Sequence, residues 1–105
     1  MRLPPALAAA STARLLELLG PPPGSVLELG FAGIHAEPLR LAGFEVTVVE
    51  PDPAHIARAR ERAGEVFAAP PNGSFDALVA PAGFDLTGID ARRTFLVQQD
   101  GSVVG

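Results

Sequence analysis

The sequence contains no cysteine, and this absence excludes disulfides, thiolate nucleophiles and cysteine-ligated metal sites together. Lysine is absent too, because all eight basic residues are arginines, and these are scattered along the chain. At a net charge of −4 the sequence offers no polybasic surface. We therefore expect neither nucleic acid nor an anionic membrane as a partner.

The sequence also lacks an apolar stretch approaching the roughly 20 residues that a membrane-spanning helix needs. Residues 1–13 have some features of a signal peptide, but Pro4 and Pro5 interrupt the apolar run and only Arg2 charges its start. We therefore expect a cytoplasmic protein. Apolar residues make up 48% of the 105 residues and charged residues 19%, which predicts one packed domain over residues 1–105.

Three segments have the apolar spacing or the boundary residues of a helix. Each is followed by a glycine, a residue that favours the left-handed backbone at a helix end. The third has the clearest start, with Asp52 as the expected N-cap and Pro53 at the first helical position. The predicted helices are residues 6–19, a segment within 34–42, and residues 53–63.

Short apolar runs, rich in β-branched residues, predict the strands. Between the third and fourth runs, the sequence permits either a very short edge strand with a crossover or a hairpin at Asn72-Gly73, and we favour the crossover. Asp100-Gly101 predicts a two-residue hairpin turn near the C-terminus. The path of residues 66–92 stays open. The predicted strands are residues 25–29, 44–50, 66–69, 75–80, 94–99 and 102–104.

Two acids and two glycines lie where the first two strands end. Glu28 precedes Gly30 and Gly33, and glycines let a backbone approach a ligand closely and adopt a positive φ. The helix that follows directs unsatisfied N–H groups into the same crevice. Glu50 ends the second strand, where doubly wound folds bind ribose hydroxyls. The order of these parts predicts a ligand notch.

The segments VLELGFAG, LAGFEVTVVEPDP and GSFDALVAP resemble the class I S-adenosylmethionine-dependent methyltransferases over about residues 24–81. Together with the strands above, the resemblance predicts an α/β, Rossmann-like methyltransferase core: a mostly parallel sheet with helices mainly on one face and a C-terminal β-hairpin. It implies S-adenosylmethionine as cofactor and methyl transfer to an unknown substrate. The cofactor-binding residues that it implies are Glu28, Gly30, Phe31, Ala32, Gly33, Glu50 and Pro51.

Within that resemblance, Glu28 and the glycine loop would hold the methionine and ribose part of the cofactor, Glu50 both ribose hydroxyls, and Pro51 the adenine side. The loop departs from the family pattern because Ala32, or a one-residue deletion, replaces the middle glycine. Phe31 has two alternatives: it packs beneath the sheet edge, or it fills the cavity that the cofactor needs.

No segment after residue 64 has clear helical periodicity, so one face of the sheet is expected to be uncovered. An uncovered apolar face predicts a homodimer or a protein partner. This favours a second hypothesis, a non-catalytic relic of the methyltransferase fold that serves dimerisation or docking. A nicotinamide-dinucleotide domain ranks third, because Glu28 fits it less well.

No residue is identified as a catalytic base, so the sequence leaves turnover open. His35 lies beside the glycine loop, but without a partner acid or metal-ligand spacing we expect a surface or capping role for it. His55 falls in the first turn of the third predicted helix, and we expect it to be solvated. No metal site is predicted.

Overall fold

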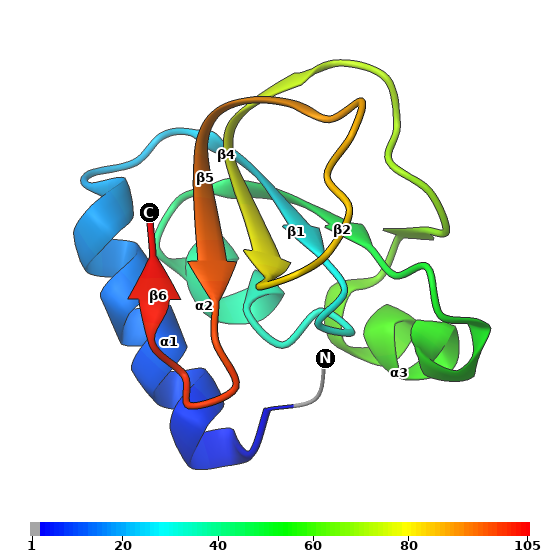
Figure 1. The fold of residues 1–105 in the computed structure, drawn as a ribbon, viewed down its shortest axis with the longest axis horizontal. Helices are drawn as coiled ribbons and strands as arrows, with labels where there is room; N and C mark the ends of the chain where they lie inside the picture. The colour runs from blue at the N-terminus through cyan, green and yellow to red at the C-terminus, as the bar shows by residue number, and fades with distance from the viewer. Residues whose placement is uncertain (1–2) are drawn as a thin grey trace.

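A six-stranded sheet of order β3-β2-β1-β4-β5-β6 forms the centre of the computed structural model, which describes residues 3–105 (Figure 1). The strands from β3 to β5 in this order are parallel, and β6 is antiparallel to β5. The strands are β1 (Ser25–Leu29), β2 (Glu45–Val49), β3 (Val66–Phe67), β4 (Ser74–Pro81), β5 (Asp90–Val97) and β6 (Val103–Val104). Arg2, the charge at the start of the leader-like stretch, lies outside the described residues.

The three predicted helices form close to their expected boundaries. They are α1 (Pro5–Leu19), α2 (Ala36–Leu41) and α3 (Pro53–Ala63). At the start of α3 the Asp52 carboxylate accepts a hydrogen bond from the Ala54 N–H at 3.0 Å, so Asp52 is the N-cap that the sequence predicts. Gly64 ends the helix with a φ of +77°.

The sheet separates two apolar layers because successive side chains point to opposite faces. Val26, Val48 and Val79 face the layer that contains Leu15 of α1 and Leu39 of α2. Leu27, Val49 and Leu78 face the opposite layer, which contains no helix residue. The α/β class, the mostly parallel sheet and the placement of helices on one face are therefore confirmed.

The prediction that the other face of the sheet is uncovered is wrong. The crossover from β4 to β5, residues 82–89, contains no helix, yet Leu86 and Ile89 pack against this face. Leu27, Leu78 and Ala80 beneath them are buried. Because the face is closed by the chain itself, it no longer supplies the reason to expect a homodimer or docking partner.

The structure also decides the path of residues 66–92. β3 is a two-residue edge strand beside β2, whereas β4 pairs with β1 on the other side, so the crossover alternative is confirmed and no hairpin forms at Asn72-Gly73. β5 begins at Asp90, four residues before its predicted start. The hairpin to β6 exists, but residues 99–101 separate Gln98 from Ser102, so its turn is longer than two residues.

Candidate functional site

The two acids singled out in the sequence lie on neighbouring strands. Glu28 is in β1, directly opposite Val48 of β2, and Glu50 follows the end of β2. β1 pairs with β2 on one side and β4 on the other, so the strand order changes direction here. In open parallel sheets, ligands bind outside the carboxyl ends of the strands at such a switch point. The loop of residues 30–33 borders this position.

The glycine loop keeps a left-handed backbone although it lacks the middle glycine. Gly30 and Gly33 have φ values of +80° and +76°, and Ala32 between them has a φ of +51°. An L-residue is strained in this region, by roughly 1–2 kcal/mol. Ala32 therefore adopts a backbone conformation that usually favours glycine.

Glu50 is buried and links the glycine loop to the residue that precedes α3. Its Oε1 accepts a hydrogen bond from the Ala32 N–H at 2.9 Å, and its Oε2 accepts one from the Asp52 N–H at 3.0 Å. A carboxylate has about four acceptor positions, so these two bonds leave further acceptor capacity. Pro51 lies between Glu50 and Asp52 in the sequence, and it is exposed.

Glu28 is fully buried and forms a pair with His35. Its Oε2 accepts a hydrogen bond from the His35 N–H at 2.7 Å and lies 2.7 Å from the imidazole Nδ1. The expectation of a surface or capping His35 is wrong: the residue occupies the N-cap position of α2 but makes no side-chain cap, and its side chain is 0% exposed. A buried carboxylate needs such a partner. Because Glu28 lies in a strand predicted to be buried, its need for a polar partner was the sequence signal that could have pointed to His35.

The polar chain continues from His35 into α1. The imidazole Nε2 lies 2.8 Å from Oγ of Ser11, and this hydroxyl donates to the Ala8 carbonyl at 3.0 Å. Serine, imidazole and carboxylate in series have the composition of a hydrolase triad. Ser11 is 0% exposed, however, so no substrate reaches its hydroxyl. The series instead connects α1, the glycine loop and β1, and Ser11 gave no signal in the sequence beyond its place in α1.

One oxygen of this buried chain has no partner. Oε1 of Glu28 makes no hydrogen bond with any described residue. Leaving a buried acceptor unsatisfied is unfavourable by about 1–3 kcal/mol, and such an atom calls for a water or a ligand. It is the one orphaned side-chain oxygen or nitrogen found among the buried atoms of residues 3–105.

The sequence drew attention to Phe31 alone, but two phenylalanines lie beside the glycine loop. Phe31 is buried in the helix-side core, and its ring meets the His35 imidazole edge-on at 4.8 Å and 88°. Phe31 is therefore a core residue packed against His35. Phe84, from the β4–β5 crossover, instead covers Gly30: a Cβ built there would lie 2.5 Å from Cε2 of that ring.

Phe84 is half-exposed, at 38%, and its importance gave no sequence signal because its crossover has no regular pattern.

Within residues 3–105, no cluster of three acids, histidines or cysteines is placed to hold a metal ion, and no helix of that range is long and apolar enough to cross a bilayer. A scan against protein-family models finds no match to this chain, and a search of curated proteins finds none.

Proposed function

We propose that this domain binds S-adenosylmethionine, or another ligand with an adenosyl group, across the ends of β1 and β2. The observation that carries the proposal is the placement of Glu50: its carboxylate borders the positive-φ glycine loop, 2.9 Å from the Ala32 N–H, at the switch point of a parallel sheet. Ribose hydroxyls would donate to the acceptor positions that Glu50 retains.

The other residues fit such a ligand on one condition. Gly30 allows close approach of a ligand to the backbone, but the Phe84 ring now occupies the space beside it. Glu50 is only 2% exposed and the Phe84 ring lies on Gly30, so ligand entry requires this ring and the crossover that carries it to move away. Phe84 would thus act as a cover over the notch.

The proposal is for binding. S-adenosylmethionine, when bound, supplies an electrophilic methyl group, but we assign no residue of the chain to its transfer. Gly30 and Glu50 would position the ligand, with Ala32 and Gly33 fixing the loop between them. Methyl transfer depends mainly on alignment of a nucleophile, so the binding step is the part that these residues support.

The second candidate is a non-catalytic relic of the fold, and a specific observation favours it. Glu50 already receives hydrogen bonds from Ala32 and Asp52, and Phe84 already covers Gly30, so the protein's own groups make contacts that a ligand would make. In this alternative the notch is permanently filled and contributes only to stability.

Calorimetry with S-adenosylmethionine, S-adenosylhomocysteine and adenosine separates these candidates. We expect saturable binding to the wild type, tighter binding to Phe84→Ala because the cover is gone, and about tenfold weaker binding to Glu50→Gln, which loses charged acceptors. Glu45→Gln, an exposed acid at the start of β2, is the matched control and should bind like wild type.

Absence of binding to both the wild type and Phe84→Ala would overturn the binding proposal and favour the relic. Binding of a nicotinamide dinucleotide in preference to all three adenosyl ligands would favour the dinucleotide alternative. Because Phe84→Ala removes a half-exposed ring, Leu41→Ala, which removes a side chain that is 81% exposed, controls for loss of surface apolar area.

A further inference from the structure

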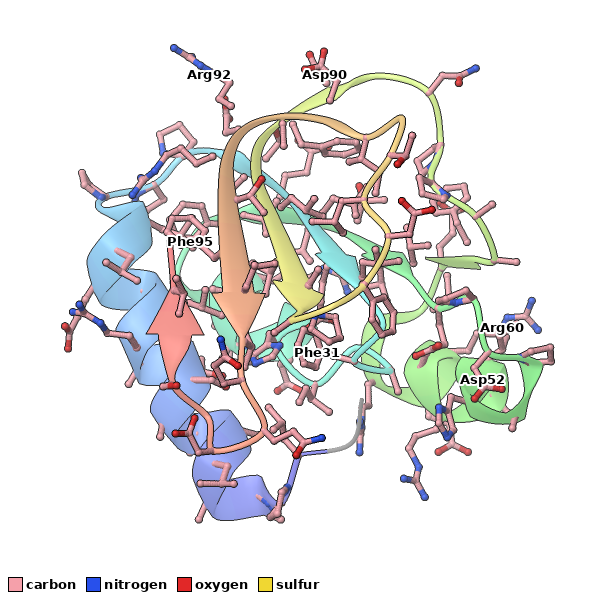
Figure 2. All side chains as sticks on the ribbon, in the orientation of Figure 1. Phe31, Asp52, Arg60, Asp90, Arg92 and Phe95 are labelled. Atoms are coloured by element: carbon pink, nitrogen blue, oxygen red, sulfur yellow. The ribbon has the colours of Figure 1, made fainter. Side chains whose placement is uncertain are left out.

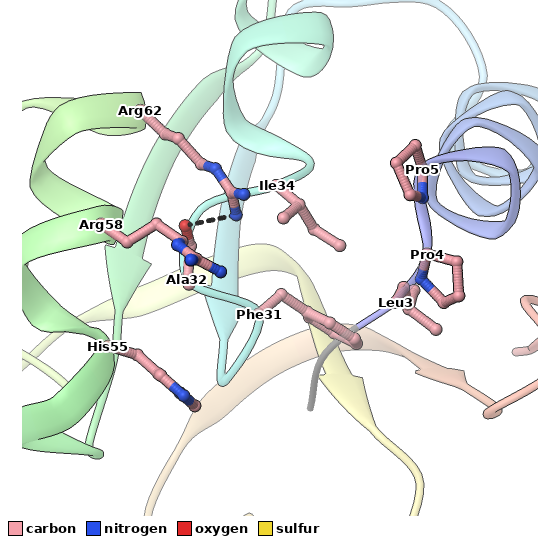
Figure 3. Close-up of a pocket in the computed structure, with 9 residues that line it drawn as sticks. All are labelled: Leu3, Pro4, Pro5, Phe31, Ala32, Ile34, His55, Arg58 and Arg62. Atoms are coloured by element: carbon pink, nitrogen blue, oxygen red, sulfur yellow. Dashed lines mark hydrogen bonds between the residues drawn. The ribbon is translucent and has the colours of Figure 1, made fainter.

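A separate cleft lies on the helix side of the glycine loop, between this loop, α3 and the segment that leads into α1 (Figure 3). Its volume is about 410 Å³, within the range of about 300–1,000 Å³ typical of small-molecule sites. Neither Glu28, Gly30 nor Glu50 lines it. The cleft therefore shares Phe31 and Ala32 of the glycine loop with the proposed adenosyl site, but lies beside the groups proposed to hold that ligand and not on them.

One wall of this cleft is basic. His55, Arg58 and Arg62 lie on one face of α3, because residues three or four apart share a helix face. Figure 3 shows both arginine side chains extending from α3 toward Ala32. None of the residues from 3 to 105 that line the cleft is acidic. The basic wall is therefore not neutralised by a carboxylate within the cleft.

The opposite wall is apolar. Leu3, Pro4 and Pro5 lie across from α3, and Phe31 and Ile34 lie between the two walls (Figure 3). Phe31 is held in place by its edge-on contact with the buried His35 ring. The cleft thus combines positive charge on one side with an apolar surface on the other.

The two arginines are not paired with acids. Among residues 3–105 the contacts between basic and acidic side chains are the ion pair Arg14–Glu17 and the histidine–carboxylate contacts His35–Glu28 and His55–Asp52, and neither Arg58 nor Arg62 takes part in any of them. Arg62 donates once, from Nη1 to the Ala32 carbonyl at 3.3 Å, and a guanidinium has further donors. Like charges four residues apart on a helix repel each other, and a bound anion would relieve this repulsion.

We propose that this cleft binds a small anionic amphiphile, a molecule that joins one phosphate or carboxylate group to a short apolar body. The anionic group would receive charge-assisted hydrogen bonds from Arg58 and Arg62, whose planar guanidinium groups match the oxygens of both anions. The apolar body would lie on Pro4, Pro5 and Ile34, the accessible side chains of the apolar wall, with Phe31 and Leu3 buried behind them. This site goes beyond the adenosyl notch and does not depend on it.

Octyl phosphate and octanoate are the probes, and octanol and inorganic phosphate are their controls. Calorimetry and backbone amide NMR are suitable readouts, since the chain has neither Trp nor Tyr for intrinsic fluorescence. We expect saturable binding of at least one anionic probe, with amide shifts in residues 31–34 and 55–62. Each methylene from hexyl to octyl should tighten binding about fourfold, the effect of burying one such group.

Arg58→Gln should weaken binding about tenfold, the loss of one charged hydrogen bond. Arg60→Gln is the matched control, because Arg60 is exposed on the same helix but does not line the cleft, and it should stay within about twofold of wild type. The proposal is overturned if neither anionic probe binds, if octanol binds equally well, if Arg60→Gln weakens binding as much as Arg58→Gln, or if the shifts centre on Gly30 and Glu50.

Discussion

The imidazole of His35 lies 2.7 Å from the carboxylate of Glu28, and neither side chain is exposed to solvent. Burial of two polar groups is tolerated when they bind each other, and here Oε2 of Glu28 is bound while its Oε1 has no partner among the described residues. The pair connects the interior of the sheet, through β1, with the loop that leads into α2. Its position therefore couples the stability of the fold to the shape of the glycine loop.

Removal of one partner should be strongly destabilising. His35→Leu leaves the Glu28 carboxylate buried without its imidazole, and we expect the free energy of unfolding to fall by about 3–5 kcal/mol. Urea unfolding followed by far-UV circular dichroism measures this. His55→Leu, a half-exposed histidine, should change it by less than about 0.5 kcal/mol. Similar stabilities for the two variants would contradict a structural role for the pair.

Gly30 should accept an alanine only if the Phe84 ring moves, at a cost in stability. In Gly30→Ala the new Cβ would approach Cε2 of Phe84 to 2.5 Å, and the φ of +80° adds strain of roughly 1–2 kcal/mol. Gly64→Ala is the matched control, because its φ is +77° and nothing lies within 4 Å of a built Cβ. We expect thermal unfolding to show a larger loss for Gly30→Ala.

The difference between these glycine variants should disappear when Phe84 is also changed to alanine. The double variant Gly30→Ala with Phe84→Ala keeps the backbone strain but loses the clash, so its two changes should be non-additive. Additive effects would show that Phe84 does not lie on Gly30 in solution. Phe31, the sequence neighbour of Gly30, is labelled among the side chains drawn in Figure 2.

Asp76 should contribute to acid unfolding. A hydrogen bond from the Ser25 backbone N–H, at 2.8 Å, lowers the pKa of Asp76 below its ordinary value of 3.8. A carboxyl whose pKa is lower in the folded state stabilises the fold above its unfolded pKa and loses this contribution as pH falls through the folded value. Asp76→Asn should therefore flatten the dependence of stability on pH below about pH 4.

Urea unfolding at a series of pH values from about 5 to about 2 measures this dependence. Glu61→Gln, an exposed acid of α3, serves as the control for removing one negative charge. If Glu61→Gln flattens the curve as much as Asp76→Asn does, net charge rather than the Ser25 hydrogen bond sets the acid behaviour.

Glu50 should protect two specific backbone amides from hydrogen exchange. Its carboxylate accepts from the N–H groups of Ala32 and Asp52, and Glu50→Ala removes both acceptors. We expect faster exchange at these amides and a loss of about 1–3 kcal/mol in stability, since Glu50 is buried. NMR exchange with Glu45→Ala as control tests this. Unchanged protection at Ala32 would contradict the observed contact.

Local sequence signals determined the elements whose causes are local. Asp52, Pro53 and Gly64 define α3 because capping and backbone preference act within a few residues. The β-branched run of β2 and the apolar run of β1 also form where they were predicted. The two acids and the loop glycines were brought together by the βαβ order alone, because parallel neighbours align their carboxyl ends.

Only the tertiary structure decided how those groups are used. His35 became the partner of Glu28, and Phe84 came to lie on Gly30, through contacts between segments that are separate in sequence and share no local pattern. The crossover of residues 82–89 closed a sheet face that helix periodicity had left open. Such contacts depend on the packing of the whole chain, since burial forces each polar or apolar group to find whichever partner the fold places beside it.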